Sequence, residues 1–111
     1  MTGSLQTQLF LFRLKSVWSD PSRVILIDRA KNVASMSQLG FSMKDVKAIC
    51  MALTPDDRVA GPAKHDHGKP GEIWVFHSMY KGVRMYLKLW LTSVDDIDRI
   101  TIISCHQEGL T

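Results

Sequence analysis

The chain has 111 residues, of which 45% are hydrophobic and 23% are charged, and its formal net charge is +3. These values exclude a wholly disordered protein and leave room for a single domain over residues 1–111. No apolar run approaches the roughly 20 residues that span a bilayer, and two cysteines, Cys50 and Cys105, are too few for a disulfide scaffold. We therefore expect a cytoplasmic protein with no membrane partner. The small excess of basic over acidic residues permits nucleic-acid binding without requiring it.

The first part of the chain, residues 1–55, is predicted to be mainly helical. Apolar residues recur at three- and four-residue spacings over residues 5–18, which predicts a helix with a broad apolar face. This face comprises Leu5, Leu9, Phe12, Phe10, Leu14 and Val17. A run of β-branched residues and leucine at residues 24–27 indicates either a short strand or an extended lead-in to the next helix.

Two short helices are predicted next. Asp28 is a suitable cap for a helix over residues 29–39, and Gly40 suits the position just after its last turn. Ser42 is expected to cap a second helix, with Asp45 completing the cap. The helical period of this second segment predicts a core face made of Met43, Val46, Ile49, Cys50 and Leu53.

The second part of the chain, residues 56–111, is predicted to be mainly sheet. It opens with a polar loop rich in Pro, Gly and His, in which residues 58–61 are an option for a short edge strand. Three further strands are predicted at residues 72–80, 83–92 and 100–106, the first two joined as a hairpin. The expected fold is therefore α+β, with N-terminal helices packed on a three- to four-stranded antiparallel sheet.

One face of this sheet is predicted to carry polar chemistry. Along residues 83–92, aliphatic side chains alternate with Arg84, Tyr86 and Lys88, which places those three on the face away from the helices, about 7 Å apart in succession. An ordinary solvated sheet face is the alternative interpretation. In the neighbouring strands, His77 shares a face with Ile73 and Val75. In the last strand, Ile102, Ser104 and His106 are expected on one side, and Ile103 and Cys105 on the other.

If His106 points to the same face, an imidazole, a phenol, an ammonium and a guanidinium lie together on one sheet. Metal-independent RNA cleavage uses such groups, because the ribose 2′-OH attacks the adjacent phosphate while a base, an acid and cations assist. A histidine that is only a surface or capping residue is the alternative. His65-Asp66-His67 is too weak a pattern to indicate a metal site, and no cofactor is expected.

Several segments, in this order, resemble the MqsR family of type II toxin–antitoxin toxins, and the likeness covers nearly the whole chain. The segments are Asp28-Arg29 with Lys31-Asn32, Leu39-Gly40-Phe41-Ser42, Leu53-Thr54-Pro55-Asp56-Asp57 with Gly61-Pro62, Gly71-Glu72-Ile73-Trp74-Val75-Phe76, Met85-Tyr86-Leu87-Lys88-Leu89, and Ile102-Ile103-Ser104-Cys105-His106. The resemblance implies a RelE-like fold, cleavage of messenger RNA and a cognate antitoxin, which we expect to bind DNA.

The resemblance also implies site residues. It carries the family's catalytic tyrosine and lysine onto Tyr86 and Lys88, and it gives His106 a cationic or proton-transferring role. The loop before Gly61-Pro62 departs from the family, because Arg58 and Ala60 stand where a tyrosine and a lysine are common. Either Arg58 or Lys64 is expected to supply the missing charge, or the activity is expected to be reduced. Val75 replaces a glutamine of the family, for which His77 is the expected substitute; with Arg84, these complete the predicted phosphate-binding set.

Two other functions are compatible with these residues. A non-catalytic RNA- or protein-binding module of the same fold fits the modest charge and the missing lysine at Ala60. An enzyme acting on small molecules is less suitable, since the chain has no Gly-rich phosphate loop or other cofactor motif.

Overall fold

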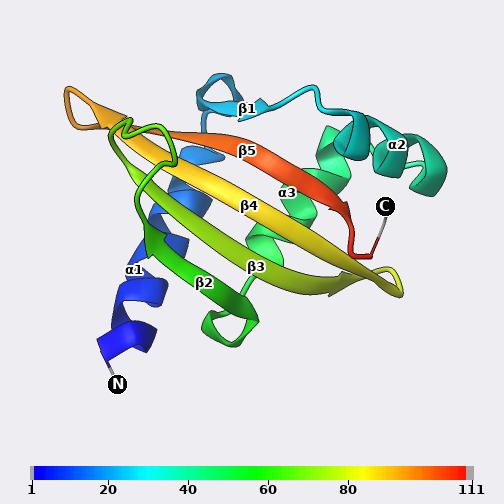
Figure 1. Cartoon of the computed structure of the whole chain (residues 1–111), viewed down its shortest axis with the longest axis horizontal. Coiled ribbons are helices and arrows are strands. Elements are labelled where there is room, and N and C mark those ends of the chain that lie inside the picture. The colour runs from blue at the N-terminus through cyan, green and yellow to red at the C-terminus, as the bar shows by residue number, and fades with distance from the viewer. Residues whose placement is uncertain (1, 110–111) are drawn as a thin grey trace.

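The computed structural model describes residues 2–109, with side chains from residue 5 onward. Figure 1 shows the helices and strands along the chain, with single 3-10 turns at Pro21–Arg23 and Pro55–Asp57. The helices are α1 (Thr2–Val17), α2 (Ala30–Leu39) and α3 (Met43–Ala52), and the strands are β1 (Val24–Leu26), β2 (Arg58–Ala63), β3 (Glu72–Tyr80), β4 (Val83–Val94) and β5 (Ile97–Gln107). No helix within these residues combines the length and the apolar character that crossing a membrane requires.

The strands form one mixed, five-stranded sheet in the order β1-β5-β4-β3-β2. Four of them are antiparallel neighbours, whereas β1 runs parallel to β5, with Val24 opposite Ile100. The predicted α+β class is confirmed, but the predicted three- to four-stranded antiparallel sheet is wrong in strand number and in type. A strand of three residues has no readable period, and its parallel partner lies far along the chain, so no local pattern could pair them.

Helices α1 and α3 cover one face of the sheet, and the core lies between them and the strands (Figure 1). Phe10 of α1 stacks on Trp74 of β3, with ring centroids 4.6 Å apart, and it also lies against Phe76 at 5.8 Å. The aliphatic residues of β4 close this layer, because Met85, Leu87, Leu89 and Leu91 are all buried. The opposite face of the sheet is left open to polar residues.

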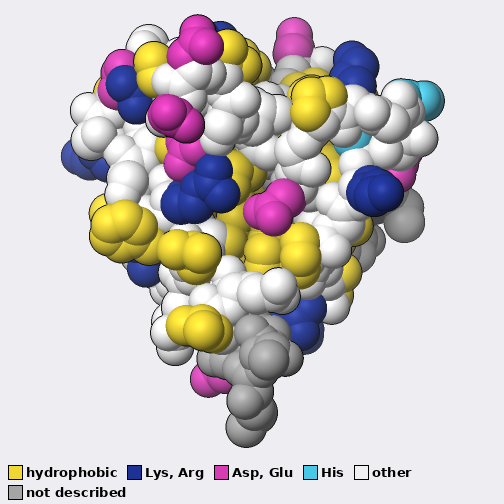
Figure 2. All heavy atoms as spheres, turned by 90° about the vertical axis from the view of Figure 1, so that its left-hand side faces the viewer, with side chains coloured by type: hydrophobic (Ala, Val, Ile, Leu, Met, Phe, Trp, Pro, Cys, Tyr) yellow, Lys and Arg dark blue, Asp and Glu magenta, His cyan; other side chains and the backbone are white. Residues whose placement is uncertain are grey.

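Helix α1 buries only half of the broad apolar face that was expected. Phe10, Leu14 and Val17 are buried, as predicted, whereas Leu5, Leu9 and Phe12 are 69%, 61% and 69% exposed. Apolar residues surround this helix on all sides, so helical spacing alone does not select the buried stripe. Figure 2 views the side of the molecule where α1 lies and shows apolar side chains reaching the surface there.

The predicted caps of α2 and α3 are confirmed in part. Gly40 ends α2 in the left-handed conformation, at φ 68°, as predicted. Asp28 does not cap α2. A tight turn, in which the Arg29 N–H donates to the Ile27 carbonyl at 2.9 Å, moves the N-cap to Arg29, and that side chain makes no capping bond.

Helix α3 has the predicted cap and most of the predicted core face. Ser42 and Asp45 form a reciprocal capping box. Four of its five expected core residues are buried, but Met43 is exposed and lines a surface groove with Val33 and Met36.

Side chains of α2 hold the edge of β5 beyond the point where β1 ends. The buried Asn32 amide donates to the carbonyls of Ile27, at 2.9 Å, and Ile103, at 3.1 Å, and it accepts the Cys105 N–H at 2.9 Å. One helical turn later, the Ser35 hydroxyl accepts the Gln107 N–H at 2.9 Å. Two side chains of a helix thus take the place of a neighbouring strand, on either side of His106.

A β-bulge changes the direction of the side chains at the end of β5. Lys88 is opposite Ser104, but its neighbour Leu89 is opposite Ile102, which leaves Ile103 as an extra residue. The expectation that Ile102 shares a side with Ser104 and His106 is therefore wrong, because Ile102 is buried in the core. Beyond the bulge, Ser104 and His106 belong to the open face, as the pairing of His106 with Tyr86 requires.

Replacing Asn32 with alanine tests the edge of β5. We expect Asn32→Ala to lower the free energy of unfolding by about 2–3 kcal/mol, because the buried Cys105 N–H loses its partner and the Ile27 and Ile103 carbonyls each lose one donor. Urea denaturation measures this change. Ser37→Ala, on the exposed side of the same helix, is the control and should lie within about 0.5 kcal/mol of the wild type. Equal stability of the two variants would show that the amide does not hold the strand.

A second test concerns Asp45, which joins α3 to the β3–β4 turn. Its carboxylate accepts the Ser42 N–H at 2.9 Å, the Tyr80 hydroxyl at 2.8 Å and the Lys81 ammonium at 3.2 Å. These bonds, above all the one from the Ser42 backbone, lower the pKa of Asp45 to about 2. The stabilisation is therefore complete above the ordinary carboxyl pKa near 4 and is lost as the pH falls toward 2.

We expect Asp45→Asn to lower the melting temperature at pH 6, and its difference from the wild type to shrink between pH 4 and pH 2. Thermal melts followed by circular dichroism over that range measure both effects. Asp56→Asn, which removes an exposed carboxylate, is the matched control. A difference that stays constant from pH 6 to pH 2 would contradict the role given to Asp45.

Candidate functional site

Three aromatic rings lie side by side across the open face of the sheet. His77 of β3 is opposite Tyr86 of β4, and Tyr86 is opposite His106 of β5. The rings of Tyr86 and His106 are stacked, with centroids 5.2 Å apart and planes 22° from parallel, while His77 lies 5.7 Å from Tyr86 at a steeper tilt. His106 therefore shares the face of Tyr86 and Lys88, as the predicted chemistry requires.

A surface pocket of about 350 Å³ opens beside this row. Tyr86, Lys88 and His106 all line it, so the structure brings the three predicted catalytic residues together. Its other lining residues are Arg29, Lys31, Ser104, Glu108 and Gly109. The pocket is rich in cations and hydroxyl groups, and Glu108 is the one carboxylate among the described residues that line it.

The ring of His106 is held in a way that suits a base. Its Nδ1 lies 3.1 Å from the Gln107 carbonyl, which can only accept, so Nδ1 carries the hydrogen and donates. In the neutral ring, Nε2 then has a free lone pair. Within residues 2–109, that nitrogen makes no hydrogen bond, and it is free to accept a proton from a substrate.

Lys88 is only weakly engaged by the rest of the protein. Its Nζ lies 4.0 Å from the carboxylate of Asp66, a well-exposed residue of the loop after β2. The same loop places His65 against Trp90, with ring centroids 4.6 Å apart. Exposed ion pairs of this kind contribute little free energy, so the Lys88 ammonium remains available to an anion.

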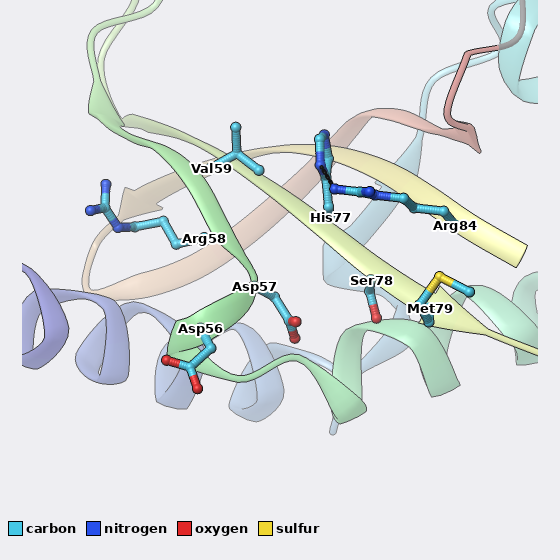
Figure 3. Close-up of a pocket in the computed structure, with 8 residues that line it drawn as sticks. All are labelled: Asp56, Asp57, Arg58, Val59, His77, Ser78, Met79 and Arg84. Carbon is cyan, nitrogen blue, oxygen red and sulfur yellow. Dashed lines mark hydrogen bonds between the residues drawn. The ribbon is translucent and has the colours of Figure 1, made fainter.

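His77 and Arg84 belong to a second cluster, which Glu108 completes. Arg84 donates from Nη2 to His77 Nδ1 at 3.2 Å, and its Nε lies 2.6 Å from the Glu108 carboxylate. Figure 3 shows the histidine and the arginine meeting on the open face. Because Arg84 can only donate, the hydrogen of His77 is on Nε2, which lies 3.4 Å from Glu108. His77 and Arg84, two of the four predicted phosphate-binding residues, are therefore held by the carboxylate of Glu108.

Arg58 lies near the cluster of His77 and Arg84, whereas Lys64 lies apart from it. Arg58 donates to the Gly61 carbonyl at 2.8 Å, and its side chain points away from His77 and Arg84 in Figure 3. All three residues nevertheless line one pocket of about 390 Å³, so the structure brings three of the four predicted phosphate-binding residues together. Lys64 is exposed in the loop that follows β2. Neither Arg58 nor Lys64 lines the pocket of His106.

The neighbouring cysteine and the paired loop histidines have other surroundings. Cys105 follows the strand alternation into the core, where burial raises the pKa of its thiol to about 11, so it is not a thiolate nucleophile. His65 accepts the His67 N–H at Nδ1, at 3.1 Å. In the part of the chain that the structure describes, no three potential metal-ligating side chains converge.

No role was predicted from the sequence for three charged residues of the pocket, Arg29, Lys31 and Glu108. Arg29 and Lys31 reach it from the start of α2, and no local pattern could place them beside β5. Glu108, two residues after His106, follows the same alternation and could have been found by extending it. The Arg29 guanidinium donates from Nη1 to the Ser104 hydroxyl at 3.1 Å and lies 3.5 Å from the Ile103 carbonyl.

Comparisons of this chain with protein-family models, with characterised proteins and with solved structures found no match. The side chains of the open face and the resemblance carried by the sequence motifs are therefore the basis for a functional proposal.

Proposed function

We propose that this protein is a cytoplasmic endoribonuclease that cleaves messenger RNA without a metal cofactor, as the toxin of a type II toxin–antitoxin pair with a RelE-like fold. The observation that carries the proposal is the stacking of Tyr86 and His106 at 5.2 Å in a pocket that Lys88 also lines. These three groups offer a proton acceptor, a proton donor and a positive charge at one place.

The proposed reaction is attack of a ribose 2′-OH on the phosphorus next to it. His106 Nε2 takes the proton of the attacking hydroxyl, and the Tyr86 phenol gives a proton to the leaving 5′-oxygen. Lys88 stabilises the additional negative charge on the phosphate oxygens in the transition state. A phosphorus–oxygen bond forms and another breaks, so the products are a 2′,3′-cyclic phosphate and a free 5′-hydroxyl.

A protein partner is part of the proposal. The resemblance implies a cognate antitoxin, and β1 gives a physical reason for one. Within the described residues, β1 pairs with β5 alone, so its other edge has backbone groups free to pair with an added strand. The antitoxin is expected to be a small DNA-binding protein.

A non-catalytic RNA-binding module is the second candidate, and one observation favours it. Glu108 lies 2.6 Å from Arg84, so a cation expected to bind phosphate already has a carboxylate partner. Such a module would bind RNA with an affinity that falls steeply with salt, and it would form no product.

Two substitutions test the catalytic assignment. We expect His106→Ala and Tyr86→Phe each to reduce the rate of RNA cleavage by about 10²- to 10⁴-fold, since a positioned acid or base contributes that much. Cleavage of a labelled RNA by the purified protein, with analysis of the 3′ ends for cyclic phosphate, measures the effect. His67→Ala, in the exposed loop, is the control. Undiminished cleavage by both variants would overturn the site, and a wild type that binds RNA without cleaving it would select the binding module.

Expression in bacterial cells tests the biological role. We expect the wild-type chain to arrest growth, and co-expression of the open reading frame next to its gene to relieve the arrest. Colony counts after induction measure both outcomes. The His106→Ala chain, made at the same level, is the control. Normal growth with the wild-type chain would contradict a toxin function.

A further inference from the structure

Two cationic side chains from outside the sheet also line the candidate pocket, and they have no role in the proposed reaction. Arg29 and Lys31 belong to the start of α2, whereas Tyr86, Lys88 and His106 belong to β4 and β5. Neither Arg29 nor Lys31 forms an ion pair with any residue that the structure describes. Glu108, the one carboxylate of the pocket, lies against Arg84 and His77 instead.

Neutral groups fix the position of Arg29 without neutralising it. Its Nη1 donates to the Ser104 hydroxyl at 3.1 Å, and the Ile103 carbonyl lies at 3.5 Å from the same atom. The guanidinium keeps its full charge and has further N–H donors at Nε and Nη2, a planar set that matches the oxygens of a phosphate. A cation held in place beside a pocket by neutral acceptors is suited to bind an anion.

The position of Ser104 relates this cation to the proposed reaction centre. Ser104 is opposite Lys88 across the strands, and its hydroxyl contacts Arg29. Lys88 and Arg29 therefore lie on two sides of one small residue. If the cleaved phosphate lies at Lys88, the adjacent phosphate of the RNA chain would lie near the start of α2. Lys31 adds a second positive charge there.

We propose that Arg29 and Lys31 bind the phosphate that follows or precedes the cleaved one, and so position a single-stranded RNA backbone across Ser104. The inference rests on the proposed function, because it takes the cleaved phosphate to lie at Lys88. The ligand class is a single-stranded nucleic-acid backbone, recognised by its phosphates and not by its 2′-OH. Arg29 and Lys31 are positioning residues, and they contribute to affinity more than to the chemical step.

Binding of DNA separates this site from the reaction. A fluorescently labelled single-stranded DNA oligonucleotide has the phosphates but no 2′-OH, so it cannot be cleaved. Its affinity for the full chain is measured by fluorescence anisotropy over a range of salt concentrations. The variants are Arg29→Gln and Lys31→Gln, singly and together. The control is Lys44→Gln with Lys47→Gln, which removes two exposed charges from α3.

We expect the double variant to bind the DNA more weakly than the control. The slope of log affinity against log salt should become shallower by about 0.7 for each phosphate that the variant no longer neutralises. With RNA as substrate, KM should rise while kcat changes little. Lys31→Gln alone removes a side chain without an ion pair, so its effect on affinity is independent of any change in the fold.

The outcomes separate this inference from the proposed function. If the double variant and the control bind DNA equally well and with the same slope, the inference is overturned, whether or not RNA is cleaved. If the wild type cleaves no RNA but DNA binding depends on Arg29 and Lys31, the backbone-binding site is supported and the catalytic proposal alone fails.

Discussion

The buried amide of Asn32 is the interaction on which the candidate site depends. It bonds to the Ile27 and Ile103 carbonyls and to the Cys105 N–H, at the point where β1 no longer covers the edge of β5. A buried backbone group without a partner is costly, so without this amide the end of β5 would have to move or admit water. His106 lies in that end segment. The helix that carries Asn32 also carries Arg29 at its start, so one element both fixes the strand and brings a cation to its open face.

The distribution of charge leaves a cation-rich pocket in a protein whose net charge is only +3. Two carboxylates far from the pocket have cationic partners of their own. Asp98, at the start of β5, bonds to Arg13 of α1 at 2.7 Å, and Asp45 of α3 bonds to Lys81 in the β3–β4 turn. Among residues 2–109, the cations of the pocket have no carboxylate partner closer than the exposed Asp66, which lies 4.0 Å from Lys88. A modest total charge is thereby compatible with a locally positive surface.

Local sequence signals were enough for parts of this architecture. Alternation along β4 placed Tyr86 and Lys88 on the open face because a strand buried on one side has an unambiguous period of two. The capping box at Ser42 was equally readable. The face of α1 was not, because its apolar residues surround the helix and only the sheet decides which of them are buried.

Contacts between segments far apart in the chain could not be predicted from the sequence, for a different reason. The parallel strand β1 pairs with residues far along the chain, and Arg29 meets Ser104 only through that pairing and through Asn32. Neither the residue types nor the spacing near Arg29 indicates its contact with Ser104. The outward position of Tyr86 was therefore predictable from its strand, whereas the bulge that turns His106 outward and the helix that completes the pocket were not.

The extra residue in β5 has a consequence for how the site is specified. Before Ile103, even-numbered residues such as Ile100 and Ile102 face the core; after it, Ser104 and His106 face outward. The same sequence paired without the bulge would turn the imidazole toward the apolar interior and the thiol of Cys105 toward the surface. A chain lacking Ile103, in contrast, would reach the present orientation with a regular strand. The outward orientation of the His106 imidazole thus depends on the register between β4 and β5. Two chains that differ by one residue in β5 can present the same site.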